Sequence, residues 1–161
     1  PGENICMITY REYRDEDWKA ICKIHDRARP DELIGSCDPR GFIPIEQDKE
    51  AEDLKACRKF VACDGETVVG FVGVDGKYLA WLYIDPGHYG KGIGRELLRI
   101  GLREIGEGAW TIVLDGNHKA IKLYESEGFQ ETRRFPGENN GYPCTCLRLE
   151  RKMEDGSLPA L

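Results

Sequence analysis

The chain has 161 residues, 40% of them hydrophobic, and carries a formal net charge of -6, with a pI of about 5.2. This length suits one domain with a sizeable buried core, and the acidic balance argues against a nucleic-acid partner, which would require a basic face. Because the sequence has neither an apolar run long enough to cross a membrane nor the basic start and apolar stretch of a signal peptide, we expect a soluble, cytoplasmic protein without a membrane partner.

The N-terminal part predicts a strand, a helix and a long loop. An alternating stretch from Ile5 predicts the strand, and Asp15 is a suitable cap for a helix that should end near Pro30. Residues 30–44 are rich in Pro, Gly and Asp and lack a regular period, which indicates a long loop. The charged segment 46–58 is then expected to form an exposed helix.

Three strands are expected within residues 59–85. Asp64-Gly65 and Asp75-Gly76 separate alternating apolar runs, and such dipeptides are a strong hairpin signal. The third strand, near residues 78–84, is apolar on both faces and should therefore lie in the centre of the sheet.

Helices and strands alternate in the C-terminal half. An apolar stripe predicts a helix over 92–105, followed by a buried strand over 109–115 and a short helix over 118–128. Segments 129–135 and 144–152 are expected to form the closing strands.

These elements indicate one domain of mixed α/β type. We expect it to span residues 1–153, with a loose tail over residues 154–161. The sequence leaves a homodimer open.

Seven cysteines are spread along the chain without the paired spacing of a zinc finger. Their odd number indicates reduced thiols. Cys144 and Cys146 would share one face of a strand, where two sulfurs could contribute to a metal site. Because no second pair accompanies them, we expect no metal and predict that the cysteines are buried as small hydrophobic residues.

Residues 85–95 read DPGHYGKGIGR, a glycine-rich turn before the helix. A dinucleotide-binding fingerprint fails because Arg95 or Leu97 stands at its third glycine position. A Walker loop fails because Lys91 is followed by Gly92 and not by Ser or Thr. What remains is a loop of backbone amides at a helix N-terminus, an arrangement that binds phosphate oxygens well. The simpler alternative is a turn whose glycines only supply positive φ angles.

The run WLYIDPGHYGKGIGRELL, followed by GNHKAIKLYESEGF, resembles the GCN5-related N-acetyltransferase (GNAT) superfamily. The signature of that superfamily is Gln/Arg-x-x-Gly-x-Gly/Ala after a strand that ends in Val/Ile-x-Pro, and the likeness covers residues 60–135. It implies a GNAT-like α/β (α+β) domain with a central mixed, mostly antiparallel sheet of about six to seven strands and about four helices.

The resemblance also implies an activity. Such an enzyme moves an acetyl group from acetyl-CoA, its cosubstrate, to a primary amine by direct attack in a ternary complex, without a covalent enzyme intermediate and without a metal. The alternative is a non-catalytic acyl-CoA-binding sensor or interaction domain.

Positions that match the superfamily pattern give the expected site. Tyr124 matches the tyrosine beside the coenzyme sulfur, which can protonate the leaving thiolate. The strand before the turn would offer backbone groups to the pantetheine arm and the acetyl carbonyl, the glycine-rich turn would hold the pyrophosphate, and an asparagine would contact the coenzyme. The expected cofactor-binding residues are Leu82, Tyr83, Ile84, Tyr89, Gly90, Lys91, Gly92, Ile93, Gly94, Arg95 and Asn117.

Two positions depart from the pattern. Tyr89 stands at the Gln/Arg position, which removes one side-chain contact but leaves the amides in place. Ile112 stands where some members carry a glutamate base. A water chain could serve instead, and Tyr78, Asp115 and His118 are the nearby polar candidates.

The resemblance also implies an acceptor pocket that is formed by a variable region of the superfamily, here residues 30–52 and 135–143. The first segment contains seven acidic residues against Arg40 and Lys49, an excess that suits an amine or a polyamine-like cation. A solvated acidic face explains the same composition. A small amine, an antibiotic, an amino acid and a protein N-terminus all remain open as acceptors.

Overall fold

Seven strands form one sheet in the order β1-β2-β3-β4-β5-β7-β6 in the computed structural model, which describes residues 7–158. Neighbouring strands are antiparallel except for the pair β4 and β5. The expectation of a mixed, mostly antiparallel sheet with a central third hairpin strand is confirmed. The strands are β1 (Ile8–Glu12), β2 (Arg58–Asp64), β3 (Thr67–Asp75), β4 (Tyr78–Ile84), β5 (Trp110–Leu114), β6 (Phe129–Asn139) and β7 (Tyr142–Arg151).

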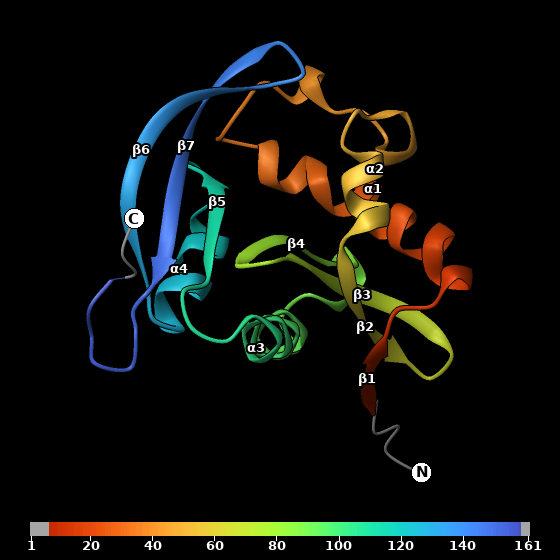
Figure 1. Cartoon of the computed structure of the whole chain (residues 1–161). Helices are drawn as coiled ribbons and strands as arrows, with labels where there is room; N and C mark the ends of the chain where they lie inside the picture. Colours follow the sequence, from red (N-terminus) through yellow and green to blue (C-terminus); the bar gives the residue numbers. More distant parts are fainter. Residues whose placement is uncertain (1–6, 159–161) are drawn as a thin grey trace.

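Four α-helices among the described residues cover the two faces of this sheet (Figure 1). One face carries α1 (Trp18–Leu33) and α2 (Ala51–Ala56), which share a buried cluster with Val61, Phe71 and Trp81. The other face carries α3 (Ile93–Ile105) and α4 (His118–Ser126). Within residues 7–158 no helix is both long enough and apolar enough to span a membrane.

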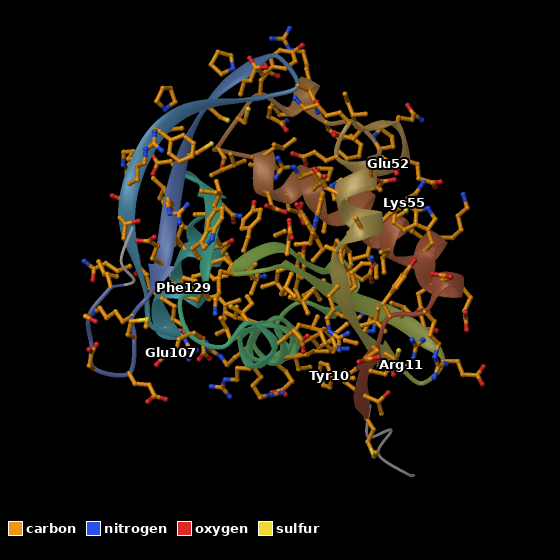
Figure 2. The ribbon with its side chains drawn as sticks, in the orientation of Figure 1. Tyr10, Arg11, Glu52, Lys55, Glu107 and Phe129 are labelled. Carbon is orange, nitrogen blue, oxygen red and sulfur yellow. The ribbon has the colours of Figure 1, made fainter. Side chains whose placement is uncertain are left out.

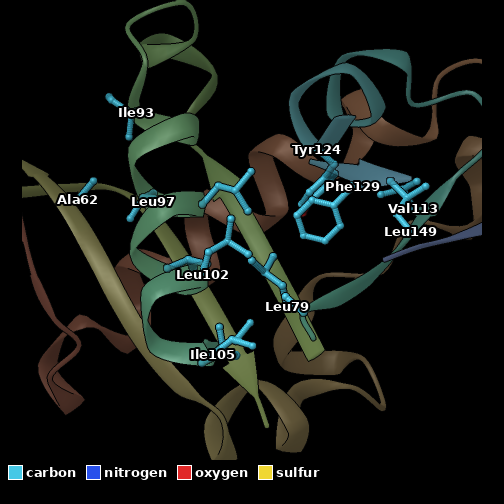
Figure 3. Packing of buried hydrophobic residues seen from close by; sticks show 14 of the residues in the cluster. Ala62, Leu79, Ile93, Leu97, Leu102, Ile105, Val113, Tyr124, Phe129 and Leu149 are labelled. Atoms are coloured by element: carbon cyan, nitrogen blue, oxygen red, sulfur yellow. The ribbon is translucent and has the colours of Figure 1, made fainter. Parts of the chain in front are cut away.

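The amphipathic stripe of α3 organises the second buried cluster (Figure 3). Leu97 and Leu98 are fully buried against the sheet, and Tyr124 of α4 joins the same cluster beside Phe129. Since α3 begins after Gly92 and ends at Gly106, its predicted bounds are confirmed.

Two-residue turns join the first hairpins, as the Asp-Gly pairs predicted. Asp64 pairs with Thr67, and Asp75 pairs with Tyr78. Gly65 and Gly76 have φ angles of +62° and +59°, which a glycine adopts at low cost.

The last hairpin is longer than the sequence predicted. Strands β6 and β7 meet across a turn at Asn140 and Gly141, which have φ angles of 49° and 89°. Pro136 lies within β6, and this is tolerated because β6 is the edge strand of the sheet. The hairpin therefore extends beyond the body of the sheet (Figure 1).

Helix α1 runs past Pro30, although the sequence predicted its end there. A proline inside a helix loses one backbone hydrogen bond, at a cost of about 3 kcal/mol. The extra turn buries Leu33 completely, which recovers about 1.5–3 kcal/mol. The correction matters because Asp31 and Glu32, expected in a loop, lie on the last turn of a helix.

Other predicted bounds also change. The first strand begins at Ile8, and Ile5 lies outside the described residues. The helix expected over 46–58 contains only the six residues of α2 and follows a short 3-10 turn, Ile45–Gln47. Most of the tail lies within the described part, where residues 154–158 are exposed and form a turn.

Six cysteines are described, all as free thiols, and Cys6 lies outside the described residues. Only Cys22 and Cys63 are buried. The expectation that the cysteines are buried is therefore wrong for Cys37, Cys57, Cys144 and Cys146, which are partly exposed.

A buried carboxylate anchors the start of α1 to the sheet. Asp17 is 5% exposed and accepts two hydrogen bonds from the guanidinium of Arg11 on β1, at 2.7 and 2.9 Å. It also accepts one from the Arg14 amide at 2.8 Å. Figure 2 labels Arg11 on β1. The Arg11 guanidinium holds the pKa of Asp17 below its usual range, so the pair stabilises the fold while Asp17 is ionised.

We predict that Asp17→Asn lowers the free energy of unfolding by about 1–3 kcal/mol at pH 7, because the guanidinium loses its charged partner. The lowered pKa means that this stabilisation is present above the unfolded pKa, about 3.9, and is lost as the pH falls below it. Urea unfolding between pH 3 and 7 measures both effects. The exposed neighbour Asp15, changed to Asn, serves as control, and equal losses in the two variants would contradict the prediction.

Candidate active site

The sheet opens between β4 and β5. These strands pair in parallel at Tyr78 and Trp110 alone, and the Trp110 amide donates to the Lys77 carbonyl at 3.1 Å. The Thr111 hydroxyl then donates to the Leu79 carbonyl at 2.8 Å. Beyond this point the two strands diverge (Figure 1), so the edge of β4 that faces β5 has no strand partner.

A bulge in β4 accompanies the opening. Leu79 pairs with Val74 of β3 and Trp81 pairs with Gly73, so Ala80 is an extra residue without a partner. A bulge of this kind bends the strand and increases its twist. The following residues Leu82, Tyr83 and Ile84 keep β3 on one side and face the opening on the other.

A cavity of about 770 Å³ lies along this opening. At one end, which we call the α3 end, it is lined by the glycine-rich turn and by the first turns of α3 and α4. At the other end, which we call the hairpin end, it is lined by the segment between α1 and α2 and by the tip of the β6–β7 hairpin. All twelve residues expected in the site except Lys91 line this cavity.

Free backbone amides are the main feature of the α3 end. Gly92 precedes the helix with a φ angle of +78°, and Gly90 has the same value. A Cβ atom at either position would meet no atom within 4 Å, so the space beside them is open. The first amides of α3 have no partner within the helix and carry its positive dipole end, which suits a phosphate group.

Two cations, Lys91 and Arg95, were expected among the cofactor-binding residues at this end. Arg95 donates to Ser126 and to Glu127, each at 2.9 Å, so Glu127 balances its charge. Lys91 does not line the cavity. Lys119 of α4 does, with Nζ 4.0 Å from the centre of the Tyr89 ring, and this cation was missed in the sequence.

Two hydrogen bonds connect α1 to the α3 end. The Tyr89 hydroxyl donates to Asp31 at 3.1 Å. The amide nitrogen of Asn117, at the start of α4, lies 3.4 Å from Oε2 of Glu32. Tyr89 is thus a bridge between the glycine-rich turn and α1, which explains how a tyrosine fits at a position where the superfamily has Gln or Arg.

Tyr124 lies deep in the cavity wall. Its side chain is 5% exposed, and its ring packs edge to face on Phe129 with centroids 5.2 Å apart. Burial raises its pKa, while a hydrogen bond with Thr111 acts in the opposite direction. The phenol is therefore protonated at neutral pH and can donate a proton but not accept one.

The hairpin end closes by contacts between segments far apart in the sequence. Arg29 of α1 donates to Asn139 of β6 at 3.1 Å. The side chains of Asn139 and Asn140 donate to the Gly41 carbonyl at 3.2 and 2.7 Å. The two segments expected to form an acceptor pocket, residues 30–52 and 135–143, therefore both contribute to the lining of one cavity.

This end of the cavity is acidic. Of the acids predicted in residues 30–52, three pair with cations elsewhere: Asp38 with Arg40, Glu46 with Lys19 and Glu52 with Lys55. The other four line the cavity, as do Asp53, Asp75 and Glu138, but Asp31 does so at the α3 end, where the Tyr89 hydroxyl donates to it. The basic residues at the hairpin end are Arg29 and Lys49.

The three polar candidates for a base do not suit that role. Asp115 pairs with Arg134 at 2.8 Å, and neither Asp115 nor His118 lines the cavity. Tyr78 does line it, but stacks on Trp110 at 4.3 Å where the strands still pair, and burial raises its pKa. Ile112 lines the cavity as an apolar residue.

Glu32 is one of the seven acidic residues of segment 30–52, but the sequence did not single it out as a site residue. Its side chain is 25% exposed, and Arg29 lies 3.3 Å from Oε2. Burial raises the pKa of its carboxyl, opposed chiefly by the charge of Arg29. No sequence motif marks it, because its place depends on the extra turn of α1.

Cys144 and Cys146 share one face of β7, as predicted, with their sulfurs 4.0 Å apart. Both line the cavity. Residues 7–158 contain no group of three or more His, Cys, Asp or Glu side chains arranged to hold a metal ion.

Sequence comparison finds relatives with a stated activity. A sequence model of the acetyltransferase (GNAT) domain matches residues 55–131. The chain is 34% identical over 86 residues to the peptidyl-lysine N-acetyltransferase YjaB of Salmonella typhimurium, covering 53% of this chain and only 59% of that protein. It is 31% identical over 116 residues to YjaB of Escherichia coli, covering 67% of this chain and 77% of that protein.

Solved structures share the fold over nearly the whole chain. The solution structure of apo YjaB from Escherichia coli matches with a TM-score of 0.64 at 27% identity, covering 89% of this chain and 97% of YjaB. The structure of yncA from Salmonella typhimurium with its cofactor acetyl-CoA matches with a TM-score of 0.68 at 21% identity, covering 96% of this chain and 98% of yncA. With its glycine-rich turn and its sequence relatives, the chain belongs to the GCN5-related N-acetyltransferase superfamily.

Proposed function

We propose that this protein transfers the acetyl group of acetyl-CoA to a primary amine by direct attack in a ternary complex. The observation that carries the proposal is one cavity that joins the free amides of α3, the unpaired edge of β4 and an acidic end. Each of the three parts suits one part of the reaction. A lysine side chain, the acceptor in the name of the YjaB relatives, is also a primary amine.

The α3 end fits the coenzyme. The amides after Gly92 would bind the pyrophosphate oxygens, with Lys119 as a nearby cation. The unpaired backbone groups of Leu82, Tyr83 and Ile84 would pair with the amide groups of the pantetheine arm, as another strand would. Acetyl-CoA supplies the reactive thioester, and the chain positions it in the opening of the sheet.

The β4 edge and Tyr124 suit the chemistry of the thioester. When an amine attacks, negative charge develops on the thioester oxygen, and an amide of β4 that points into the opening stabilises it. The Tyr124 phenol, buried and protonated, then donates a proton to the departing sulfur.

The hairpin end suits an acceptor that arrives as a cation. An alkyl amine is protonated at neutral pH, since a lysine amine has a pKa of about 10.4. The acidic residues that line this end, among them Asp48, Glu50 and Asp53, favour such a group over an anion.

The cysteine content of the chain bears on its location. The odd number of cysteines suits a reducing compartment, which supports a cytoplasmic location of the protein.

A first prediction concerns the glycine-rich turn. Gly92→Asn introduces a residue that tolerates positive φ angles. Its side chain would occupy the open space beside the first amides of α3. We expect the affinity for acetyl-CoA to fall by about tenfold to a hundredfold, because the pyrophosphate would lose one or two charge-assisted hydrogen bonds. Calorimetric titration with acetyl-CoA measures it.

Gly65→Asn is the matched control for this experiment. Gly65 lies in the turn between β2 and β3, outside the cavity lining, with a φ angle of +62°, and a Cβ there would likewise meet no atom within 4 Å. We expect its affinity to remain close to that of the parent. If Gly92→Asn binds acetyl-CoA as tightly as this control does, the glycines serve only the turn.

A second prediction concerns Tyr124. Tyr124→Phe keeps the ring that packs on Phe129 and removes the proton donor. Since a positioned acid typically contributes about 10²- to 10⁴-fold, kcat should fall by that factor with little change in acetyl-CoA affinity. Thiol release at saturating amine gives the rate, and thermal melting checks the fold.

Two outcomes would contradict this second prediction. Unchanged turnover would make Tyr124 a packing residue only. Thiol release that is absent from the parent itself, across a panel of amines, would favour the acyl-CoA-binding sensor over the enzyme.

A further inference from the structure

The proposed acetyl transfer requires a group that takes a proton from the acceptor. An alkylammonium ion has no lone pair and cannot attack a carbonyl carbon, so it must first lose a proton. Tyr124 is protonated and cannot accept one, and the superfamily's glutamate position holds Ile112. The base must therefore come from another element that faces the cavity.

We propose that the Glu32 carboxylate accepts this proton from the acceptor ammonium. The inference rests on the proposed acetyl transfer to an amine and adds the residue that makes the amine reactive. The carboxylate lines the cavity, and its side chain is 25% exposed, so it is accessible to an acceptor and to water.

The position of Glu32 along the cavity carries the argument. On one side it contacts Asn117, at the start of α4 and the α3 end. On the other side it contacts Arg29, which binds Asn139 of the hairpin. Its side chain thus lies between the two ends, where the thioester would meet an acceptor. The other carboxylates of the cavity lack this pair of contacts: Asp31, for example, binds Tyr89 at the α3 end.

Tyr83 connects Glu32 to β4. Its phenol lies near the carboxylate: burial, followed by the charge of Glu32, raises the pKa of Tyr83. A carboxylate held against the unpaired strand is positioned beside the groups that would stabilise the thioester oxygen. The charged and titratable groups around Glu32 are Arg29 and Asp31 of α1, Glu50, Tyr83 of β4, Tyr89 and Tyr124.

The proton balance closes with two groups of the chain. The ammonium gives one proton to Glu32, and the freed lone pair forms the bond between nitrogen and the acetyl carbon. As the bond between that carbon and sulfur breaks, Tyr124 protonates the sulfur, and the second proton of the nitrogen returns to Tyr124 through water. Glu32 then releases its proton to solvent. The net products are the amide, the thiol and one proton.

The test compares Glu32→Gln with the parent on two amines. One is an alkyl amine, which is protonated at neutral pH, and the other is an aromatic amine, which is neutral there. We expect kcat/KM for the alkyl amine to fall by about 10²- to 10⁴-fold at pH 7 and to recover as the pH rises toward the pKa of the amine. The aromatic amine needs no deprotonation before it attacks, so kcat/KM for this amine should fall much less.

Controls separate this role from a structural one. Glu32→Asp, which keeps the charge, should restore part of the rate with the alkyl amine. Glu46→Gln, an exposed acid paired with Lys19, should behave like the parent. Equal losses on both amines without recovery at high pH would overturn the proposal, because they would show that Glu32 only supports the structure.

A binding experiment tests whether Glu32 contacts the acceptor ammonium even if no amine is acetylated. The alkylammonium ion is titrated calorimetrically into the protein saturated with CoA. Its affinity should be about tenfold or more lower in Glu32→Gln than in the parent, because one charged hydrogen bond is lost. Equal affinities would overturn the role of Glu32. Absence of turnover by the parent, with this difference in binding retained, would overturn the acetyl transfer alone.

Discussion

The site depends on the separation of β4 from β5. A buried strand normally has hydrogen-bonding neighbours on both sides, because unpaired amides and carbonyls lose their water without compensation. Here the pairing stops after Tyr78, and the Thr111 side chain satisfies the next carbonyl, that of Leu79. The backbone groups beyond are left for a ligand. The bulge at Ala80 turns them toward the cavity, so one break in the ladder creates both the space and its binding groups.

The helices set the chemistry on either side of this break. Helix α3 presents its N-terminal amides and positive dipole end to the cavity, and this favours an anionic group there. The segment between α1 and α2 and the β6–β7 hairpin contribute three acids, Asp48, Glu50 and Glu138, against one cation, Lys49, to the opposite end. A ligand with phosphates at one end of the cavity and a cation at the other end is favoured at both.

Helix α1 links the fold to the proposed chemistry. Asp17, the residue before its first turn, ties it to β1, and its Asp26 carboxylate accepts a hydrogen bond from the Ile45 amide at 2.8 Å. Its last turn holds Arg29, Asp31 and Glu32. Because these three side chains contact the hairpin, the glycine-rich turn and α4, the position of α1 determines the geometry of the whole cavity.

The sequence by itself determined the elements whose signals are local. The Asp-Gly pairs predicted the hairpins, and the apolar stripe predicted α3. The glycine-rich turn, Asn117 and Tyr124 indicated the superfamily, and with it eleven of the residues that line the cavity. Such features depend on backbone preferences within a few residues. Only the tertiary structure decided what depends on contacts over long separations. Burial of Leu33 carried α1 through Pro30, the Glu127 carboxylate engaged Arg95, and the hairpin tip met Gly41. Glu32 became part of the site for the same reason: its neighbours Tyr83 and Asn117 are distant in sequence, and only packing brings them together.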